Sequence, residues 1–322
     1  ALEIYDRFSR VVRSSEKPEM YKGGVYFQMG KIDEAIKCYS RAVTRNPDTP
    51  VTRKDWARNY DLIRSMDQQA GELLEQLQED GLADSTIVFF WSDHGVGLPR
   101  AKRWLYDSGM HVPLIVRMPS LFRKEKQGQP GSVNDELVSL IDLAPTMLNL
   151  AHLPLPPYFQ GRAFLGSSLS PERQYVYGAR DRMDERYDFI RTVTDGRFHY
   201  IRNYNPHFIY GQYVAYNFVT PSTAAWKRDF DKGILKKPQE HFWGLKPTEE
   251  LYDLQEDPDE VNNLVGSTAA SKKLKELRKA LNNWCLEIRD VGFLPEGEIH
   301  SRSVGTTPYE MGHDDKLYPL ER

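Results

Sequence analysis

The sequence has few cysteines, little net charge and no long apolar run. Only two cysteines, Cys38 and Cys285, occur among 322 residues, too few for a disulfide scaffold or a structural zinc cluster. A formal net charge of −3 gives no global attraction to nucleic acid or to an acidic membrane surface. The longest stretch without Asp, Glu, Lys or Arg is Asn203–Trp226, which contains two prolines and many polar residues. Such a stretch is unsuited to a hydrocarbon core, so the sequence predicts neither a nucleic-acid partner nor a membrane span.

The composition that remains is that of a globular protein. Hydrophobic residues make up 40% of the chain and charged residues 28%, and the length predicts about two domains. The chain starts at Ala1, and no basic segment leading into an apolar run follows. We therefore expect no signal peptide within these residues, and we expect processing or truncation to have removed what came before.

The first fifty residues are predicted to be helical. Apolar residues recur at helical spacing over residues 1–13, 20–30 and 32–43, and a turn at Gly30 makes the last two a helical hairpin. Residues 16–49 resemble a tetratricopeptide repeat, whose spacing is matched at Gly23, Tyr26, Gly30, Asp33–Ile36, Tyr39, Ala42 and Pro47. The alternative is an ordinary helical hairpin. One repeat cannot bury its own faces, so partner helices would have to come from elsewhere.

The rest of the chain alternates between helical and strand-like patterns, which predicts an α/β fold. A capping-box pattern at Thr52–Asp55 begins a long amphipathic helix that ends at Gly81. Apolar runs at 86–91 and 112–116 predict strands buried on both faces. Further segments are a helix over 137–150 kinked at Pro145, strands at 175–177, 189–193, 199–201 and 249–254, a hairpin turn at Asp195-Gly196 and a helix over 271–289. The tail from Gly292 onward, rich in Gly, Pro and charge, is expected to be loosely attached.

Six ordered blocks carry a family resemblance. The first is Thr86-Ile-Val-Phe-Phe-Trp-Ser-Asp-His-Gly95, and the others lie at 99–109, 112–117, 140–146, 250–254 and, as a broken block, 257–258 with 262–264. In these blocks the chain resembles the C-terminal half of a type I sulfatase, within the alkaline-phosphatase-like superfamily. The resemblance implies a partial α/β sandwich followed by an α+β C-terminal subdomain. We expect a helical segment over 1–49, part of the catalytic domain over 50–165, and the C-terminal subdomain with its tail over 166–322.

The resemblance also assigns candidate active-site residues. Asp93 matches a family calcium ligand, and a carboxylate is a hard donor that suits Ca²⁺. His94 lies where the family has Asn or His at the edge shared by metal and sulfate, and we assign it a sulfate contact more readily than metal ligation. Lys102 matches the lysine that touches sulfate and can protonate the leaving oxygen. The plainer alternatives are a helix N-cap for Asp93, a structural hydrogen bond for His94 and a solvated basic turn for Lys102.

The family's nucleophile motif, Cys/Ser-x-Pro/Ala-Ser-Arg, is absent from these 322 residues. Cys38-Tyr39-Ser40-Arg41 comes near to it but lacks one residue and the Pro or Ala, so we expect Cys38 to serve packing. Cys285 is likewise expected to be a packing residue of a helix. No residue before Asp93 matches the paired aspartates that complete the calcium site in the family. We therefore predict that this polypeptide alone does not hydrolyse sulfate esters.

The substrate side is expected in the C-terminal subdomain. Arg180 and Arg182 follow a predicted strand, and arginines hold sulfate and carboxylate groups in bidentate geometry. A salt-bridged surface loop is an equally good interpretation. The aromatic residues of Asn203–Trp226 could stack on sugar rings, but they could also pack an irregular loop against the core.

Two functional hypotheses follow. The first is a sulfuric ester hydrolase, acting on sulfated carbohydrate and dependent on Ca²⁺, with a periplasmic or secreted location implied by the resemblance. The second is an interaction protein that binds a protein partner through its helical repeat and carries a degenerate sulfatase-like domain. An inactive fragment is a third possibility.

Overall fold

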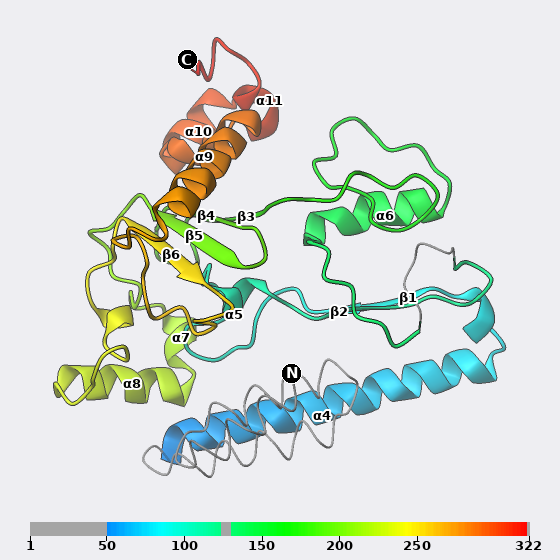
Figure 1. Cartoon of the computed structure of the whole chain (residues 1–322), viewed down its shortest axis with the longest axis horizontal. Coiled ribbons are helices and arrows are strands. Elements are labelled where there is room, and N and C mark those ends of the chain that lie inside the picture. Colours follow the sequence, from blue (N-terminus) through cyan, green and yellow to red (C-terminus); the bar gives the residue numbers. More distant parts are fainter. Residues whose placement is uncertain (1–49, 124–129, 321–322) are drawn as a thin grey trace. The chain divides into compact units, whose positions relative to one another are not determined.

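A computed structural model describes residues 50–123 and 130–320 of the chain (Figure 1). These residues divide between two compact units. The first unit contains the described residues of 50–99, 112–134 and 215–235, and the second contains those of 100–111, 135–214 and 236–320. Each unit thus combines segments that are distant in the sequence. The boundaries expected near residues 49 and 165 stay predictions, and the helical repeat expected over 16–49 lies outside the described residues.

The long helix of the first unit is α4 (Pro50–Glu79), followed by Gly81 in a left-handed conformation with φ of +69°. This C-terminal stop is as the sequence predicts. The predicted capping box at Thr52–Asp55 is wrong, because α4 already includes these residues. The buried Asp55 carboxylate instead accepts a 2.6 Å hydrogen bond from the amide of Ser222, in the first turn of α8 (Pro221–Asp231). Asp55 therefore caps a different helix, and so ties α4 to α8.

Two strands of the first unit pair with each other. β1 (Val88–Trp91) and β2 (Leu114–Arg117) are antiparallel, with Phe89 opposite Val116. Both strands lie within a residue or two of their predicted positions, but burial on both faces is wrong. Trp91 is 43% exposed and Ile115 51% exposed, because β1 and β2 pair only with each other within the described part of the chain.

The second unit is built on a four-stranded antiparallel meander. Its strands follow the chain order β3 (Val176–Arg180), β4 (Ile190–Thr194), β5 (Phe198–Asn203) and β6 (Glu249–Asp253). All four predicted strands and the hairpin turn at Asp195-Gly196 are confirmed, and Gly196 takes the positive φ of +91° that the turn requires.

A helical segment precedes this meander in the second unit. It consists of the 3₁₀ turn η2 (Leu140–Asp142) and the helix α6 (Leu143–Leu150). The predicted helix over 137–150 therefore starts later than expected. Pro145 does not kink it, because it lies in the first turn of α6, where its missing N–H is not needed.

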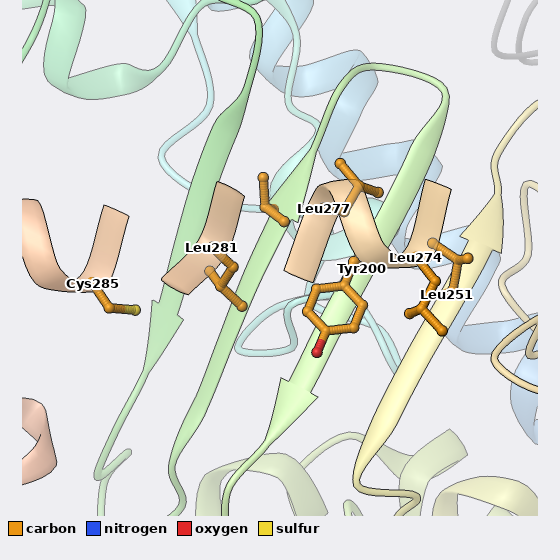
Figure 2. Packing of buried hydrophobic residues seen from close by; sticks show 7 residues of the cluster. Tyr200, Leu251, Leu274, Leu277, Leu281 and Cys285 are labelled. Atoms are coloured by element: carbon orange, nitrogen blue, oxygen red, sulfur yellow. The ribbon is translucent and has the colours of Figure 1, made fainter. Parts of the chain in front are cut away.

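Helix α9 (Ser271–Glu287) covers one face of the meander and completes the apolar core (Figure 2). Leu274, Leu277 and Leu281 point from the helix toward the strands, where Tyr200 and Leu251 meet them. Cys285 belongs to the same cluster, and burial raises the pKa of its thiol to about 12. The prediction that Cys285 is a packing residue is confirmed.

The tail after Gly292 is folded, so the expectation of loose attachment is wrong. It contains α10 (Glu296–Arg302) and α11 (Pro308–Gly312), and Met311 is fully buried. Arg289 donates to the carbonyl of Tyr318 at 2.7 Å, and the Tyr318 hydroxyl donates to the carbonyl of Asp290 at 2.7 Å. These bonds tie the tail to the end of α9. Among the described helices, none combines the length and the apolar character needed to span a membrane.

Candidate active site

The loop that follows β1 carries Asp93 and His94 in the first unit. The Asp93 side chain is 81% exposed, and its Oδ1 lies 3.5 Å from Nε2 of His94. Nδ1 of His94 lies 2.8 Å from the carbonyl oxygen of Gly95, and the Ser92 hydroxyl donates to the carbonyl of His94 at 2.6 Å. The carboxylate is thus open to a ligand, while the imidazole already has two polar neighbours.

These two residues do not make a calcium site by themselves. Ca²⁺ takes six to eight oxygen ligands, and Asp93 supplies one carboxylate. Across residues 50–123 and 130–320, no three His, Cys, Asp or Glu side chains are grouped closely enough to hold a metal ion. The described residues therefore do not fit Ca²⁺, and calcium binding by Asp93 stays a prediction.

The loop over residues 100–111 carries Lys102 in the second unit. Arg100 and Arg103 have left-handed backbone conformations, with φ of 65° and 81°. Left-handed non-glycine residues are uncommon and cluster at functional sites. Ala101 and Trp104 of the same loop are buried, at 3% and 4% exposed, whereas Lys102 is half-buried. The loop thus places Lys102 between two buried side chains and two strained arginines.

A buried carboxylate lies beneath this loop. Glu250 of β6 accepts hydrogen bonds from the hydroxyls of Tyr252 at 2.6 Å, Tyr106 at 3.2 Å and Tyr210, and from the Asn203 amide at 2.7 Å. Burial, reinforced by the charge of Glu250, raises the pKa of all three phenols. The tyrosines therefore stay protonated donors, and Tyr106 joins the loop to the sheet.

Arg180, a predicted substrate contact, is buried at the end of β3. It is 2% exposed, its guanidinium carbon lies 4.0 Å from the ring centroid of Trp104, and Nη1 donates to the carbonyl of Arg103. Its Nε lies 3.8 Å from a carboxylate oxygen of Asp188, and burial lowers the pKa of Arg180. Arg180 thus holds the Lys102 loop through its contacts with Arg103 and Trp104, and its contact with substrate stays a prediction.

Arg182 has the opposite surroundings. Its side chain is 56% exposed and pairs with Glu296 at 2.7 Å. Two residues further on, Asp184 forms a 2.6 Å ion pair with Arg103 of the Lys102 loop. The segment around Arg182 is therefore linked to that loop, and the Arg182 guanidinium is solvent-exposed while it is paired with Glu296.

The aromatic residues of 203–214 differ in their burial. Tyr204 stacks on Phe189 with ring centroids 4.5 Å apart, and Tyr210 is buried against Glu250, so both serve packing. Tyr213 is 55% exposed, and its carbonyl accepts a 2.6 Å hydrogen bond from Arg186. Tyr213 is thus an aromatic residue of this stretch that a sugar could reach.

The structure groups the predicted residues by unit. Asp93 and His94 lie together in the first unit, and Lys102, Arg180 and Arg182 belong to the second. Sequence reasoning missed the residues that hold the Lys102 loop, above all Arg100, Glu250 and Glu260. Arg100 and Glu250 lie inside the blocks that carry the family resemblance, and Glu260 lies between the last two quoted stretches. The charge of a residue in or beside these blocks was the one signal that could have pointed to them.

Two family models match the chain. The model described as Sulfatase matches residues 15–153, and the model described as N-sulphoglucosamine sulphohydrolase, C-terminal, matches residues 100–207. The first match begins ahead of the segment expected to form a tetratricopeptide repeat and includes it. That repeat is not confirmed, and a repeat-based interaction module is not supported.

Curated relatives agree with these matches. An ulvan-active sulfatase of Formosa agariphila is 41% identical over 254 residues, which are 79% of this chain and 42% of that protein. The N-sulphoglucosamine sulphohydrolase of Homo sapiens is 30% identical over 262 residues, 76% of this chain and 50% of that protein. The chain thus spans about half the length of these relatives.

A solved structure supports the fold. A protein of Bacteroides fragilis assigned to the sulfatases superposes with a TM-score of 0.54 at 19% identity, over 84% of this chain and 51% of that one. The mixed α/β architecture with small, partial sheets agrees with a portion of the alkaline-phosphatase-like fold, as the sequence predicts. Together with the family matches and the curated relatives, this places the chain in the sulfatase family.

Proposed function

We propose that the chain forms part of a hydrolase that cleaves sulfate esters of carbohydrates. The observation that carries this proposal is the fixed loop around Lys102, joined by the Arg103–Asp184 ion pair to the segment of the exposed Arg182. Lys102 and Arg182 are both cationic, so each would attract an anionic ligand that reaches this part of the second unit. The relatives named as sulfatases agree with sulfate as that anion.

The chemistry of sulfate ester cleavage suits Lys102. Anionic oxygens must be neutralised, and the leaving alcohol oxygen needs a proton as its bond to sulfur breaks. An ammonium on a flexible stem can contact the sulfate and donate that proton. The sulfate contact expected of His94, which lies in the first unit, stays a prediction. The nucleophile motif is absent from the 322 residues, so a nucleophile would have to be supplied from outside this sequence.

The carbohydrate class is inferred from the second unit. Arg182 would bind a further sulfate or a uronate carboxylate, and Tyr213 would stack on a sugar ring. The buried Arg180 would act by holding the backbone of Arg103 in place. A relative named as active on ulvan and one named for N-sulphoglucosamine support a sulfated carbohydrate as the substrate class. A periplasmic or secreted site of action fits such a substrate.

The test is binding of glucosamine 6-sulfate to the full chain by calorimetry, with unsulfated glucosamine as the reference ligand. Lys102→Ala should lower the affinity for the sulfated sugar about tenfold or more, because a charge-assisted contact is lost. Lys275→Ala, at an exposed position of α9, is the matched control and should bind like the unaltered chain. Equal binding of both sugars, or equal binding by both variants, would contradict the proposal.

Turnover is a separate question. Because the sequence lacks the nucleophile motif, we expect no hydrolysis of 4-nitrophenyl sulfate by the chain alone. Hydrolysis that disappears in Lys102→Ala would show that a nucleophile is present after all.

A further inference from the structure

Glu260 and its neighbours hold the loop over residues 100–107 at both ends. One end is Arg100, whose Nη2 donates to the carbonyl of Glu260 at 2.6 Å and whose Nη1 donates to the carbonyl of Asp259. The other end is Asp107, whose amide donates to Oε2 of Glu260 at 2.7 Å. One residue, about 150 positions away in the sequence, thus fastens both sides of the segment that contains Lys102.

Glu260 is itself fixed. It is 2% exposed and left-handed, with φ of 51°. Its second carboxylate oxygen, Oε1, lies 2.5 Å from Nδ1 of His199, and Nε2 of His199 contacts the hydroxyl of Thr192. Because His199 and Thr192 belong to neighbouring strands of the meander, the position of the Glu260 carboxylate is set by the sheet.

The segment between the two anchors has little freedom. The guanidinium carbon of Arg100 lies 3.8 Å from the ring centroid of Tyr106, and Ala101 and Trp104 are buried on either side of Lys102. Just beyond the second anchor, the backbone at Gly109 packs closely on the loop, since a Cβ there would lie 2.2 Å from the carbonyl oxygen of Trp104. The backbone that carries the Lys102 ammonium is therefore set by the sheet through Glu260.

We infer that Glu260 is a positioning residue for Lys102, fixing the backbone from which its ammonium reaches a sulfate ester. This inference rests on the proposed function for the role of Lys102, but not for the geometry of the loop. A buried carboxylate that only stabilised the fold would have no specific effect on Lys102. A positioning carboxylate changes Lys102 even while the rest of the unit stays folded.

The test compares Glu260→Gln with Glu249→Gln in the full chain. Glu249 is the first residue of β6 and, like Glu260, accepts several hydrogen bonds. Its donors are Arg278 and Tyr200, which lie outside the loop. Both variants should lose thermal stability. Only Glu260→Gln should speed hydrogen exchange at the Asp107 amide, by about tenfold or more, because its charged acceptor is lost.

The second readout is a spectroscopic signature of Lys102. Lysines are dimethylated with ¹³C, and the Lys102 resonance is identified by its absence in Lys102→Arg. We expect this resonance to shift or broaden in Glu260→Gln and to stay in place in Glu249→Gln. Unchanged exchange and an unchanged resonance in Glu260→Gln, or equal changes in both variants, would overturn the inference.

Two further measurements keep the test decisive. If Glu260→Gln does not fold, Arg100→Ala removes the other half of the same clamp and should produce the same loop-specific changes. Adding glucosamine 6-sulfate to the unaltered chain should shift the Lys102 resonance. If it does not, the sulfate contact proposed for Lys102 is refuted, whereas the exchange data alone decide whether Glu260 holds the loop.

Discussion

The two faces of the meander β3–β6 are covered in different ways. On one face, Val193, Tyr200 and Leu251 pack against the leucines of α9. On the other face, Thr192, His199 and Glu250 are just as deeply buried, but each is engaged in hydrogen bonds. Neighbouring residues of the same strands alternate between these two environments, as the pleat of a strand requires.

The difference shows how the two faces divide their roles. Apolar burial is non-directional and tolerates small shifts, so the α9 face supplies stability. Hydrogen bonds are directional, and a buried polar group is costly when it loses its partner. The polar face therefore fixes where the loop over 100–111 lies. Each buried group of this face that loses its hydrogen-bond partner lowers the stability of the fold.

The largest expected effect is on the apolar face. Leu277→Ala should lower the free energy of unfolding by about 3 kcal/mol, because a fully buried side chain is replaced by a cavity. Leu286→Ala, on the exposed side of the same helix, should change it by less than about 0.5 kcal/mol. Urea denaturation followed by circular dichroism measures both. Similar losses in the two variants would mean that α9 does not form this core.

The next effect is on the polar face. Glu250→Ala should cost about 2 kcal/mol, because three tyrosines and Asn203 each lose a buried charged acceptor. Glu276→Ala, at a half-exposed pair on α9, should cost less than about 0.5 kcal/mol. The same denaturation assay applies. A loss larger than that of Leu277→Ala would reverse the ranking of the two faces.

A smaller effect is expected where the apolar face ends. Tyr177 and Trp284 are stacked in parallel with centroids 4.7 Å apart. A double-mutant cycle with Tyr177→Leu and Trp284→Leu should give a coupling of about 1 kcal/mol. Additive losses, with no coupling, would show that the stacking contributes nothing beyond buried area.

The smallest effect is a pH dependence at the end of β6. Hydrogen bonds from Arg197 hold the pKa of Asp253 below its usual value. A depressed folded-state pKa gives stability that is present above the unfolded value of about 3.9 and is lost as the pH falls through the folded value. Asp253→Asn should therefore flatten the acid side of the stability curve slightly. An unaltered curve below pH 4 would contradict this.

Much of the second unit could be predicted from the sequence. The strands of the meander and α9 follow from alternating and helical apolar patterns, and their register places Leu251 opposite Tyr200. The capping role of Asp55 could not be predicted, because its partner Ser222 lies on a helix far away in the chain. The folded tail was missed for a related reason, since its order depends on bonds from Arg289 and on the buried Met311 rather than on local pattern.

The candidate site shows the same division. The family resemblance alone proposed Lys102 and Asp93, and Arg182 was proposed from its place after a predicted strand. Nothing local to these residues indicated what holds them. The burial of Arg180 could not be predicted from the sequence either. An arginine at the end of a strand has the same local pattern whether it faces solvent or packs on a tryptophan ring.

The sequence by itself determined the family, the sheet of the second unit and the helix that covers it, because periodicity and motif blocks are properties of neighbouring residues. Only the tertiary structure decided which charged residues are buried and what they hold. The contacts of Glu260 with Arg100, Asp107 and His199 join segments separated by some 60 to 160 residues. Directional bonds between such distant segments depend on the packed sheet, and no local pattern encodes them.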